Sequence, residues 1–330
     1  MKKFVFFLTI FFNVLCYAED HSAIALMYHR FNEPEYQSTS ISSEIFEKHL
    51  KHIKENGFKV LKLEDFVDIL INKKKIPAKT LIITVDDAFR SFYDFGFPLL
   101  KKYDFPFSVF VSTASVSNND SSDFMSWEML KEIQQHKGMV FNHTVDHLSL
   151  VGLSDNMIIE QVTRASNELK SKLGVDNPKI FSYPYGESSE RVEEILEKIG
   201  ILAAFSQHSA PLNHDDSVFR LPRFSLNNQY GSLDRLKMIF KTKRLPIRNL
   251  TFTDSVTNKE EIKISFQSSM NLEKINCYIN QGVDLIKNIT KQKVKLKLKG
   301  LKPGQRHRLN CTIMINGSIY WFGKMVKRVN

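Results

Sequence analysis

The chain has 330 residues, of which 42% are hydrophobic and 25% are charged, a composition typical of folded soluble proteins. This length exceeds that of a typical single core, so two domains are expected. The formal charge of +10 at pH 7 comes largely from scattered lysines, and no basic patch is interleaved with aromatic residues, which argues against nucleic-acid binding.

The chain begins with a sequence typical of a secretory signal peptide. Lys2 and Lys3 precede an apolar run over residues 4–15, and Ala18 stands before two acidic residues. We expect cleavage after Ala18, which makes residues 1–18 the signal peptide and predicts an exported protein, periplasmic or secreted. The apolar run is shorter than the ~20 residues needed to span a bilayer, and a retained N-terminal anchor is the alternative.

From about residue 22 to residue 243, short apolar runs alternate with amphipathic segments. The apolar runs are rich in Val, Ile and Phe, as buried strands are, and lie at residues 23–27, 59–63, 80–85, 107–112, 139–141, 179–182 and 201–205. Helical patterns lie at residues 43–56, 63–72, 91–103, 126–135, 154–173 and 188–199. This alternation predicts an α/β fold for residues 19–245, a distorted (β/α) barrel that can be complete or incomplete.

After about Pro246, strand-like segments follow one another directly. They lie at residues 249–253, 261–267, 274–279, 293–298, 307–315 and 318–326. We interpret residues 246–330 as a small all-β sandwich, an accessory domain. Cys277 and Cys311 lie in this part of the chain, and export permits a disulfide between them, but the sequence leaves open whether their geometry allows one.

Polar residues follow several of the predicted barrel strands. Asp86 and Asp87 follow the strand at 80–85, and His143 and His147 follow the strand at 139–141. Other strands are followed by Tyr28-His29, by Tyr183-Pro184-Tyr185-Gly186 and by Gln207-His208. Barrel enzymes build their active sites at the carboxyl ends of the strands, so we expect these side chains to meet in one site.

The two histidines and the two aspartates suggest a catalytic metal site. His143 and His147 are four residues apart, so one helical turn or a tight loop would point both rings the same way. With one carboxylate they make a ligand set that leaves positions open for water and substrate. Alone, an Asp-Asp pair is more often a helix N-cap and Pro-Tyr-Gly is a turn, and their order after successive strands favours the site.

These motifs resemble those of the polysaccharide deacetylases of carbohydrate esterase family 4, over residues 22–230. Ile83–Ala88, with its Asp-Asp, is similar to the first motif of that family. His143–His147 matches the second motif, His-[Ser/Thr]-x-x-His, and Phe181–Gly186 resembles the third, which is centred on Pro-Tyr. The Pro-Tyr-Gly-Glu ending and Met27–His29 are more similar to the branch of exported exopolysaccharide de-N-acetylases, such as those acting on poly-β-1,6-N-acetylglucosamine.

The resemblance implies a hydrolase that removes N-acetyl groups from a polysaccharide. Asp87, His143 and His147 would bind one divalent metal ion, zinc in this family, and Asp86 would be the general base that activates water. The metal and the backbone N–H of Tyr185 would stabilise the oxyanion. An O-acetyl esterase with the same site and a catalytically weak glycan-binding protein on the same scaffold are the alternatives.

The chain departs from the family pattern beside the predicted base. Ala88 stands where the family has a glycine, which narrows the allowed backbone. Ser182 stands where the family has an arginine that contacts the base, so the electrostatic tuning of Asp86 is open. Arg223 is a candidate charge partner for Asp86 from elsewhere in the chain.

The late family motif that supplies a general-acid histidine is not evident. His208 is our candidate for this acid, because it follows a predicted strand, and His29 and His214 are its rivals. Tyr183 and Trp127 are candidates for the walls of a sugar pocket, and a core position in its helix is the equal alternative for Trp127.

Overall fold

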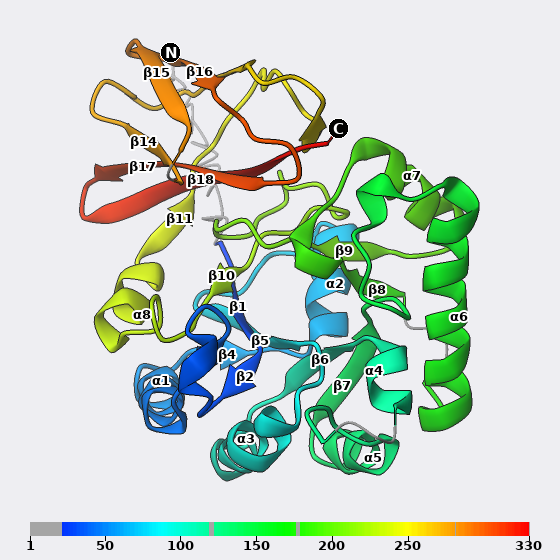
Figure 1. Cartoon of the computed structure of the whole chain (residues 1–330). Coiled ribbons are helices and arrows are strands. Elements are labelled where there is room, and N and C mark those ends of the chain that lie inside the picture. Colours follow the sequence, from blue (N-terminus) through cyan, green and yellow to red (C-terminus); the bar gives the residue numbers. More distant parts are fainter. Residues whose placement is uncertain (1–21, 119–121, 176–178, 281, 330) are drawn as a thin grey trace, which may run out of the picture.

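The computed structural model describes residues 22–118, 122–175, 179–280 and 282–329. The predicted signal peptide, residues 1–18, lies outside these ranges. The described chain forms a curled parallel sheet surrounded by helices and, beside it, a region of mainly antiparallel sheets (Figure 1). Within the described residues, no helix combines the length and the hydrophobicity that crossing a membrane requires.

An eight-stranded parallel sheet forms the first region. Its strands are β1 (Ile24–Tyr28), β4 (Lys59–Val60), β5 (Thr80–Asp86), β6 (Phe107–Val111), β7 (Gly138–Asn142), β8 (Ile180–Ser182), β9 (Ala203–Phe205) and β10 (Phe224–Ser225). Their order is β10-β1-β5-β6-β7-β8-β9, and β4 pairs with β5 outside this path. Each of the seven apolar runs of the sequence overlaps one of these strands.

The sheet curls into an incomplete barrel whose open side is crossed by the segment before β10 (Figure 1). Leu221 forms a parallel bridge with Phe205 of β9, and Phe224 pairs with Leu26 of β1. Arg223 lies between these two contacts, so its side chain can enter the barrel interior. The predicted α/β fold with a distorted (β/α) barrel is confirmed, and the barrel is incomplete.

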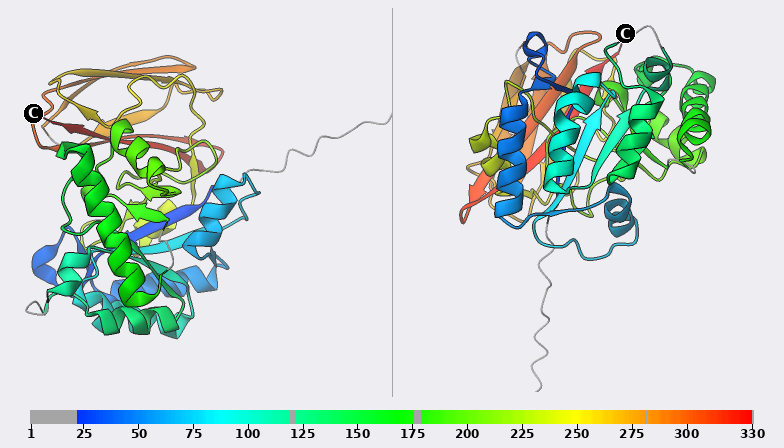
Figure 2. Two further views of the ribbon diagram at one scale, coloured as in Figure 1. Left: turned by 90° about the vertical axis from the view of Figure 1, so that its right-hand side faces the viewer. Right: turned by 90° about the horizontal axis from the view of Figure 1, so that it is seen from below.

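Helices cover the outer face of the sheet (Figure 2). The six predicted helices are present as α1 (Ser43–Glu55), α2 (Leu63–Ile71), α3 (Phe97–Tyr103), α5 (Trp127–Gln135), α6 (Asp155–Leu173) and α7 (Glu190–Lys198). The helix predicted at 91–103 starts with a π-helical turn, Phe92–Gly96, because Pro98 lacks the N–H that would continue an α-helical ladder. Two short helices were not predicted, α4 (Thr113–Ser117) and α8 (Leu233–Ile239).

Two further sheets build the C-terminal region. Its strands are β11 (Thr242–Arg244), β12 (Val256–Thr257), β13 (Ile262–Gln267), β14 (Asn276–Ile279), β15 (Asp284–Ile289), β16 (Lys293–Lys299), β17 (Arg306–Ile315) and β18 (Ser318–Arg328). One sheet has the order β11-β18-β17-β14, with β12 beside β18, and the other has the order β13-β16-β15. Their facing residues form a hydrophobic core that includes Phe266, Leu296 and Phe322.

One predicted strand in this region is absent, and the strands β11, β12 and β15 were not predicted. Residues 249–253 form no regular strand, because Asn249 and Phe252 have positive φ angles of 54° and 60°, which break an extended backbone. The strand β15 was missed because its residues are mostly exposed and show no alternation of apolar and polar positions.

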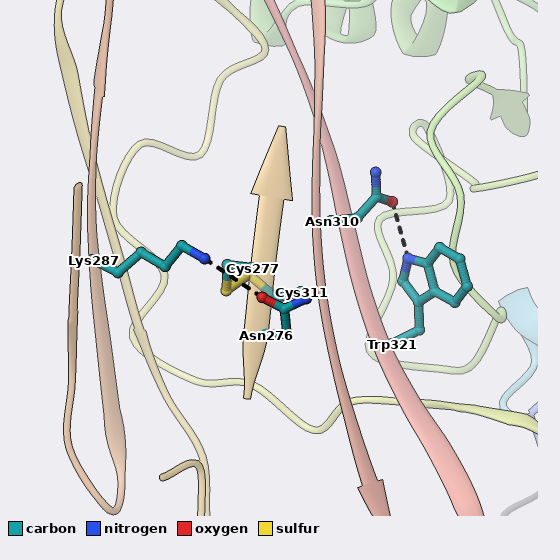
Figure 3. The surroundings of a disulfide bond; sticks show 6 residues. All are labelled: Asn276, Cys277, Lys287, Asn310, Cys311 and Trp321. Atoms are coloured by element: carbon teal, nitrogen blue, oxygen red, sulfur yellow. Dashed lines mark hydrogen bonds between the residues drawn. A yellow bond between two sulfur atoms is a disulfide. The ribbon is translucent and has the colours of Figure 1, made fainter. Parts of the chain in front are cut away.

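Cys277 and Cys311 form a disulfide that joins β14 to β17, where the two cysteines are directly paired across the strands (Figure 3). Beside it, the Trp321 Nε1–H donates to Asn310 Oδ1 at 3.0 Å. The Trp321 ring packs edge-on against Phe224 of the barrel, at 5.3 Å between ring centroids. Trp321 therefore joins the β-sandwich to the barrel.

Candidate active site

Asp86, the last residue of β5, is held by a buried arginine. Arg223 Nη1 donates to Asp86 Oδ1 at 2.7 Å, and Arg223 Nη2 donates to Asp86 Oδ2 at 2.8 Å. Both side chains are fully buried. The contact predicted between Arg223 and Asp86 is therefore present, as a bidentate ion pair of the kind that fixes a carboxylate in one orientation.

The remaining donors of Arg223 are also used. Nη1 donates to Thr84 Oγ1 at 3.1 Å, Nη2 donates to Ser182 Oγ at 2.8 Å, and Nε donates to the Ser206 carbonyl at 3.1 Å. Burial favours the neutral form of Asp86, but the Arg223 charge and hydrogen bonds outweigh it and lower the pKa of this carboxyl. The arginine that the family pattern places at position 182 thus has a counterpart at Arg223, which bonds to Ser182.

The structure brings Asp87, His143 and His147 together. His143 Nε2 lies 3.3 Å from Asp87 Oδ1, and His147 Nε2 lies 3.2 Å from the same oxygen. One nitrogen or oxygen atom from each residue lies within 4.8 Å of the others, a spacing that could hold a metal ion. Burial raises the pKa of Asp87, but the adjacent rings of His143 and His147 outweigh it and hold this pKa well below its usual range.

The donor set fits a divalent cation. His143 Nδ1 lies 2.7 Å from the Ser182 carbonyl, which can only accept, so Nδ1 carries the hydrogen and Nε2 of the neutral ring presents its lone pair. Asp87 Oδ1 and His143 Nε2 are both buried without a satisfactory hydrogen-bond partner. Two lone pairs that face each other in a buried place favour a cation between them, and two histidines with one carboxylate suit zinc and similar ions.

Several backbone positions around the site are left-handed. Positive φ angles occur at Asp87 (74°), Ala88 (57°), Thr144 (72°), His147 (54°) and Tyr185 (59°). Such conformations are uncommon in residues other than glycine and tend to cluster at functional sites. They place the metal-binding side chains on tight loops, so the pair of histidines lies on a loop and not on a helical turn.

The turn after β8 contributes Tyr185 but not Tyr183. The Tyr185 ring lies against His147, with ring centroids 4.6 Å apart, and it is partly exposed. Tyr183 is fully buried and its hydroxyl donates to the Phe219 carbonyl at 2.9 Å, so the prediction that it lines a sugar pocket is wrong. Trp127 belongs to the hydrophobic core, in agreement with the alternative interpretation for this residue.

His29, at the end of β1, is the histidine that lies beside Asp86. Its Nε2 is 4.0 Å from Asp86 Oδ2, and its side chain lines a cleft at the surface. Burial lowers the pKa of this imidazole, and the negative charges of Asp87 and Asp86 oppose that effect. The geometry therefore favours His29 for the position of a general acid.

His208 occupies a different environment. Its neighbours Gln207 and Ser209 line the cleft, whereas His208 is buried and does not belong to the lining. Burial lowers the pKa of its ring well below the usual range, and so do positive charges on Arg244, Arg220, Lys324 and Arg308. His208 thus lies outside the cleft lining that includes His29, and its rival His214 lies on the same loop between β9 and β10.

The cleft has a volume of about 540 Å³ and lies between the barrel and the β-sandwich. Its lining includes residues that were not identified from the sequence, among them Arg235, Tyr278, Arg306 and Arg308. A signal was present in β17, where Arg306, Arg308 and Asn310 occupy alternate positions and so share one face.

Residues 73–204 of the chain match the family model of polysaccharide deacetylase. A poly-β-1,6-N-acetyl-D-glucosamine N-deacetylase of Staphylococcus aureus is 26% identical over 235 residues, which covers 64% of this chain and 80% of the relative. The structure of IcaB from Ammonifex degensii aligns with a TM-score of 0.60 at 25% identity, over 67% of this chain and 97% of IcaB.

The fold is also similar to that of the Streptococcus pyogenes deacetylase PplD, solved in complex with acetate. The two align with a TM-score of 0.62 at 22% identity, over 66% of this chain and 98% of PplD. These findings confirm the resemblance that the motifs at Asp86, His143 and Pro184 predicted. Residues 73–204 therefore form a polysaccharide deacetylase domain, and the similarity of the barrel to known deacetylases supports a deacetylase of the hydrolase class.

Proposed function

We propose that this enzyme removes N-acetyl groups from N-acetylhexosamine units of an envelope or extracellular polysaccharide, after export and cleavage of residues 1–18. One observation carries the proposal. Asp87, His143 and His147 are spaced to hold a metal ion, and they lie next to the Asp86 carboxylate, which Arg223 fixes in place. The similarity to a relative named for poly-β-1,6-N-acetyl-D-glucosamine supports an amide substrate over an ester.

Asp87, His143 and His147 would hold a divalent metal ion, which when bound supplies Lewis-acid polarisation of the acetyl carbonyl and makes water more acidic. Asp86 accepts a proton from the attacking water as the new C–O bond forms. Each oxygen of Asp86 keeps a lone pair for this task after accepting one hydrogen bond from Arg223.

His29 delivers a proton to the sugar nitrogen as the C–N bond breaks, so that acetate and an amine are the products. Its position, with Nε2 at 4.0 Å from Asp86 Oδ2, puts the acid and the base on the same side of the site. The backbone N–H of Tyr185 is our candidate for stabilising the oxyanion, since its ring lies against His147.

The ion pair between Arg223 and Asp86 also counts against a protein that only binds glycans. Ser182, in place of the family arginine, was the departure that motivated that alternative. Because Arg223 supplies a guanidinium to the same carboxylate, the charge environment of a working base is preserved.

The test is acetate release by the mature chain, residues 19–330, from β-1,6- and β-1,4-linked N-acetylglucosamine oligomers and from an O-acetyl ester. We expect release from an oligomer that a chelator abolishes and added zinc restores. Asp86→Asn should lower turnover by at least about 100-fold and leave the bound metal in place. Asp94→Asn, an exposed carboxylate in an ion pair with Arg90, is the matched control. Metal-replete protein that releases no acetate from any of these substrates would contradict the proposal.

A further inference from the structure

The cleft beside the candidate active site is built by both regions of the chain. His29 and Met27 line it at the end of β1, and Tyr278 and Arg308 line it from the β-sandwich. A polysaccharide chain whose acetamido group reaches His29 would therefore extend along the sandwich. The β-sandwich is in place to contact the sugars on either side of the reacting one.

Three arginines line this cleft and outnumber the carboxylates that reach them. Arg306 Nε lies 3.7 Å from Glu187, a carboxylate that Lys327 also contacts at 2.5 Å. Arg235 and Arg308 form no ion pair with any residue that the structure describes, and Arg235 Nε is buried without a hydrogen-bond partner. The cleft thus carries uncompensated positive charge.

The second observation that favours an anionic ligand is the partial burial of these guanidinium groups. Loss of solvent lowers the pKa of Arg235 and of Arg308, and for Arg308 the charge of Arg306 acts in the same direction. Partial loss of solvent without a carboxylate partner disfavours the charged form, and an anionic ligand offsets that effect. Arg308 keeps its orientation through one bond, from Nε to the Gln207 carbonyl at 3.3 Å.

Tyrosines lie beside these cations. Tyr230 is 52% exposed and Tyr278 is 43% exposed, and both line the cleft. The Arg235 guanidinium lies over the Tyr230 ring, 5.2 Å from its centroid. Exposed aromatic faces with adjacent polar groups are suited to the apolar face and the hydroxyl groups of a sugar ring.

We propose that this cleft binds an acidic polysaccharide, and that Arg235 and Arg308 bind a carboxylate or phosphate group on a sugar next to the one that is deacetylated. This inference rests on the proposed function, because it places the acetamido group at His29. Guanidinium groups suit both anions, since their paired N–H donors match two oxygens of either.

Arg306 also contacts the turn that carries Tyr185. Its Nη1 donates to the Tyr185 carbonyl at 3.1 Å, and its guanidinium lies 5.3 Å from the centroid of the Tyr185 ring. A substitution there would disturb the turn at the candidate active site as well as the cleft. The test therefore uses Arg235 and Arg308.

Binding is measured first, in the full mature chain with Asp86→Asn so that no probe is consumed. The probes are a hyaluronan octasaccharide, with a carboxylate on every second sugar, a phosphate-substituted N-acetylglucosamine oligomer and a neutral β-1,4-linked N-acetylglucosamine oligomer. We expect at least about tenfold tighter binding of one anionic probe than of the neutral oligomer, with the preference falling as salt rises. The anionic probe that binds better tells a carboxylate from a phosphate.

Arg235→Gln and Arg308→Gln, each added to Asp86→Asn, should reduce the anionic preference by about tenfold. Lys263→Gln, an exposed lysine on β13, is the matched control and should leave the preference unchanged. Equal binding of neutral and anionic probes, or an unchanged preference in both arginine variants, overturns the inference. Acetate release by the unsubstituted chain is assayed separately, so failure of the proposed function would show there and the binding data would still decide the charge preference.

Discussion

The strands of the barrel and those of the β-sandwich differ in how much of their two faces is buried. Every residue of β1, β5 and β6 is buried, because the parallel sheet is covered on both sides. Along β13, β16 and β17, buried residues alternate with more exposed ones. Polar side chains on the two kinds of strand therefore meet different constraints.

In the barrel, a polar side chain must find its partners inside. Thr84, Asp86 and Ser182 all accept hydrogen bonds from Arg223. These bonds hold the Asp86–Arg223 ion pair in one orientation beside the candidate metal ligands. In the sandwich, the half-buried face of β17 that carries Arg308 lines the cleft, where a ligand can reach it. This difference supports our proposals that the reaction takes place in the barrel and that the surface shared by both regions binds the glycan.

The largest effect is expected inside the barrel, from Arg223→Met. This change leaves the Asp86 carboxylate buried without its partner, and it should lower the free energy of unfolding by about 3–5 kcal/mol at pH 7. The double variant Asp86→Asn, Arg223→Met should lose less, because no uncompensated charge stays behind. Urea unfolding measures both, and a loss below about 1 kcal/mol in the single variant would show that the pair is not buried as described.

Removing the disulfide tests whether the sandwich is stabilised separately from the barrel. Cys277 and Cys311 are 34 residues apart in sequence, so replacing both with serine should destabilise the sandwich by about 4 kcal/mol. The chain has two tryptophans, Trp127 in the barrel and Trp321 in the sandwich, and removing either one leaves a reporter for the other region. We expect the Trp321 transition to move to lower urea more than the Trp127 transition.

Equal movement of the two transitions would contradict this comparison, since the two regions would then unfold as one unit. Reductant supplies the control for the disulfide. It should destabilise the unsubstituted chain and have no further effect on the serine variant.

Lys324, buried where the sandwich meets the barrel, predicts a pH dependence of stability. Burial lowers the pKa of its amine to about 7, from 10.5 for an ordinary lysine, and Nζ donates to the Thr253 carbonyl at 2.9 Å. Between these pH values the unfolded chain binds more protons than the folded one, so the free energy of unfolding rises with pH. From pH 7 to pH 9 the gain is about 2 kcal/mol, and below pH 7, where both states bind the proton, this lysine adds no further pH dependence.

The matched comparison for this prediction is Lys324→Met. The variant lacks this titration, so the unsubstituted chain should gain about 2 kcal/mol relative to it between pH 7 and pH 9. Stability curves that stay parallel over this range would show that the amine keeps an ordinary pKa in the folded chain.

The same difference in burial explains which elements could be predicted from the sequence. Strands covered on both faces are continuous apolar runs, so the central strands of the barrel were all found. β10 has only two residues, Phe224 and Ser225, and β15 is mostly exposed, so neither leaves a hydrophobic pattern. Residues 249–253 were predicted as a strand because they are rich in β-forming residues. Their backbone is not extended, since Asn249 and Phe252 have positive φ angles.

At the site, residues directly after strands were predictable and distant partners were not. Asp87 and His143 follow the ends of β5 and β7, so chain order alone brings them to one edge of the sheet. Arg223 is 137 residues from Asp86, and its contact depends on the segment that crosses the open side of the barrel. His29 was named only as a rival to His208, because the sequence does not show which loop side chains face the cleft.

The smallest effect is expected at Ala88, where the family pattern has a glycine. Its φ of 57° costs an alanine about 1–2 kcal/mol relative to the right-handed region, and glycine would relieve this. Glycine would also lose a buried methyl group, worth about 0.8 kcal/mol, and about 0.5–1 kcal/mol to backbone entropy. Because these terms nearly cancel, Ala88→Gly should change the free energy of unfolding by less than about 1 kcal/mol.

Ala88→Val is the contrasting variant, since a β-branched residue at positive φ is strained and would overpack a position that belongs to the barrel core. Urea unfolding of both variants measures the balance. A loss above about 2 kcal/mol in Ala88→Gly would mean that the methyl group packs more tightly than an ordinary buried methyl. In that case the packing of the Ala88 methyl group in this barrel core would offset the strain of its positive φ. Glycine could then be restored without loss of stability only together with a second substitution that fills the space of the methyl group.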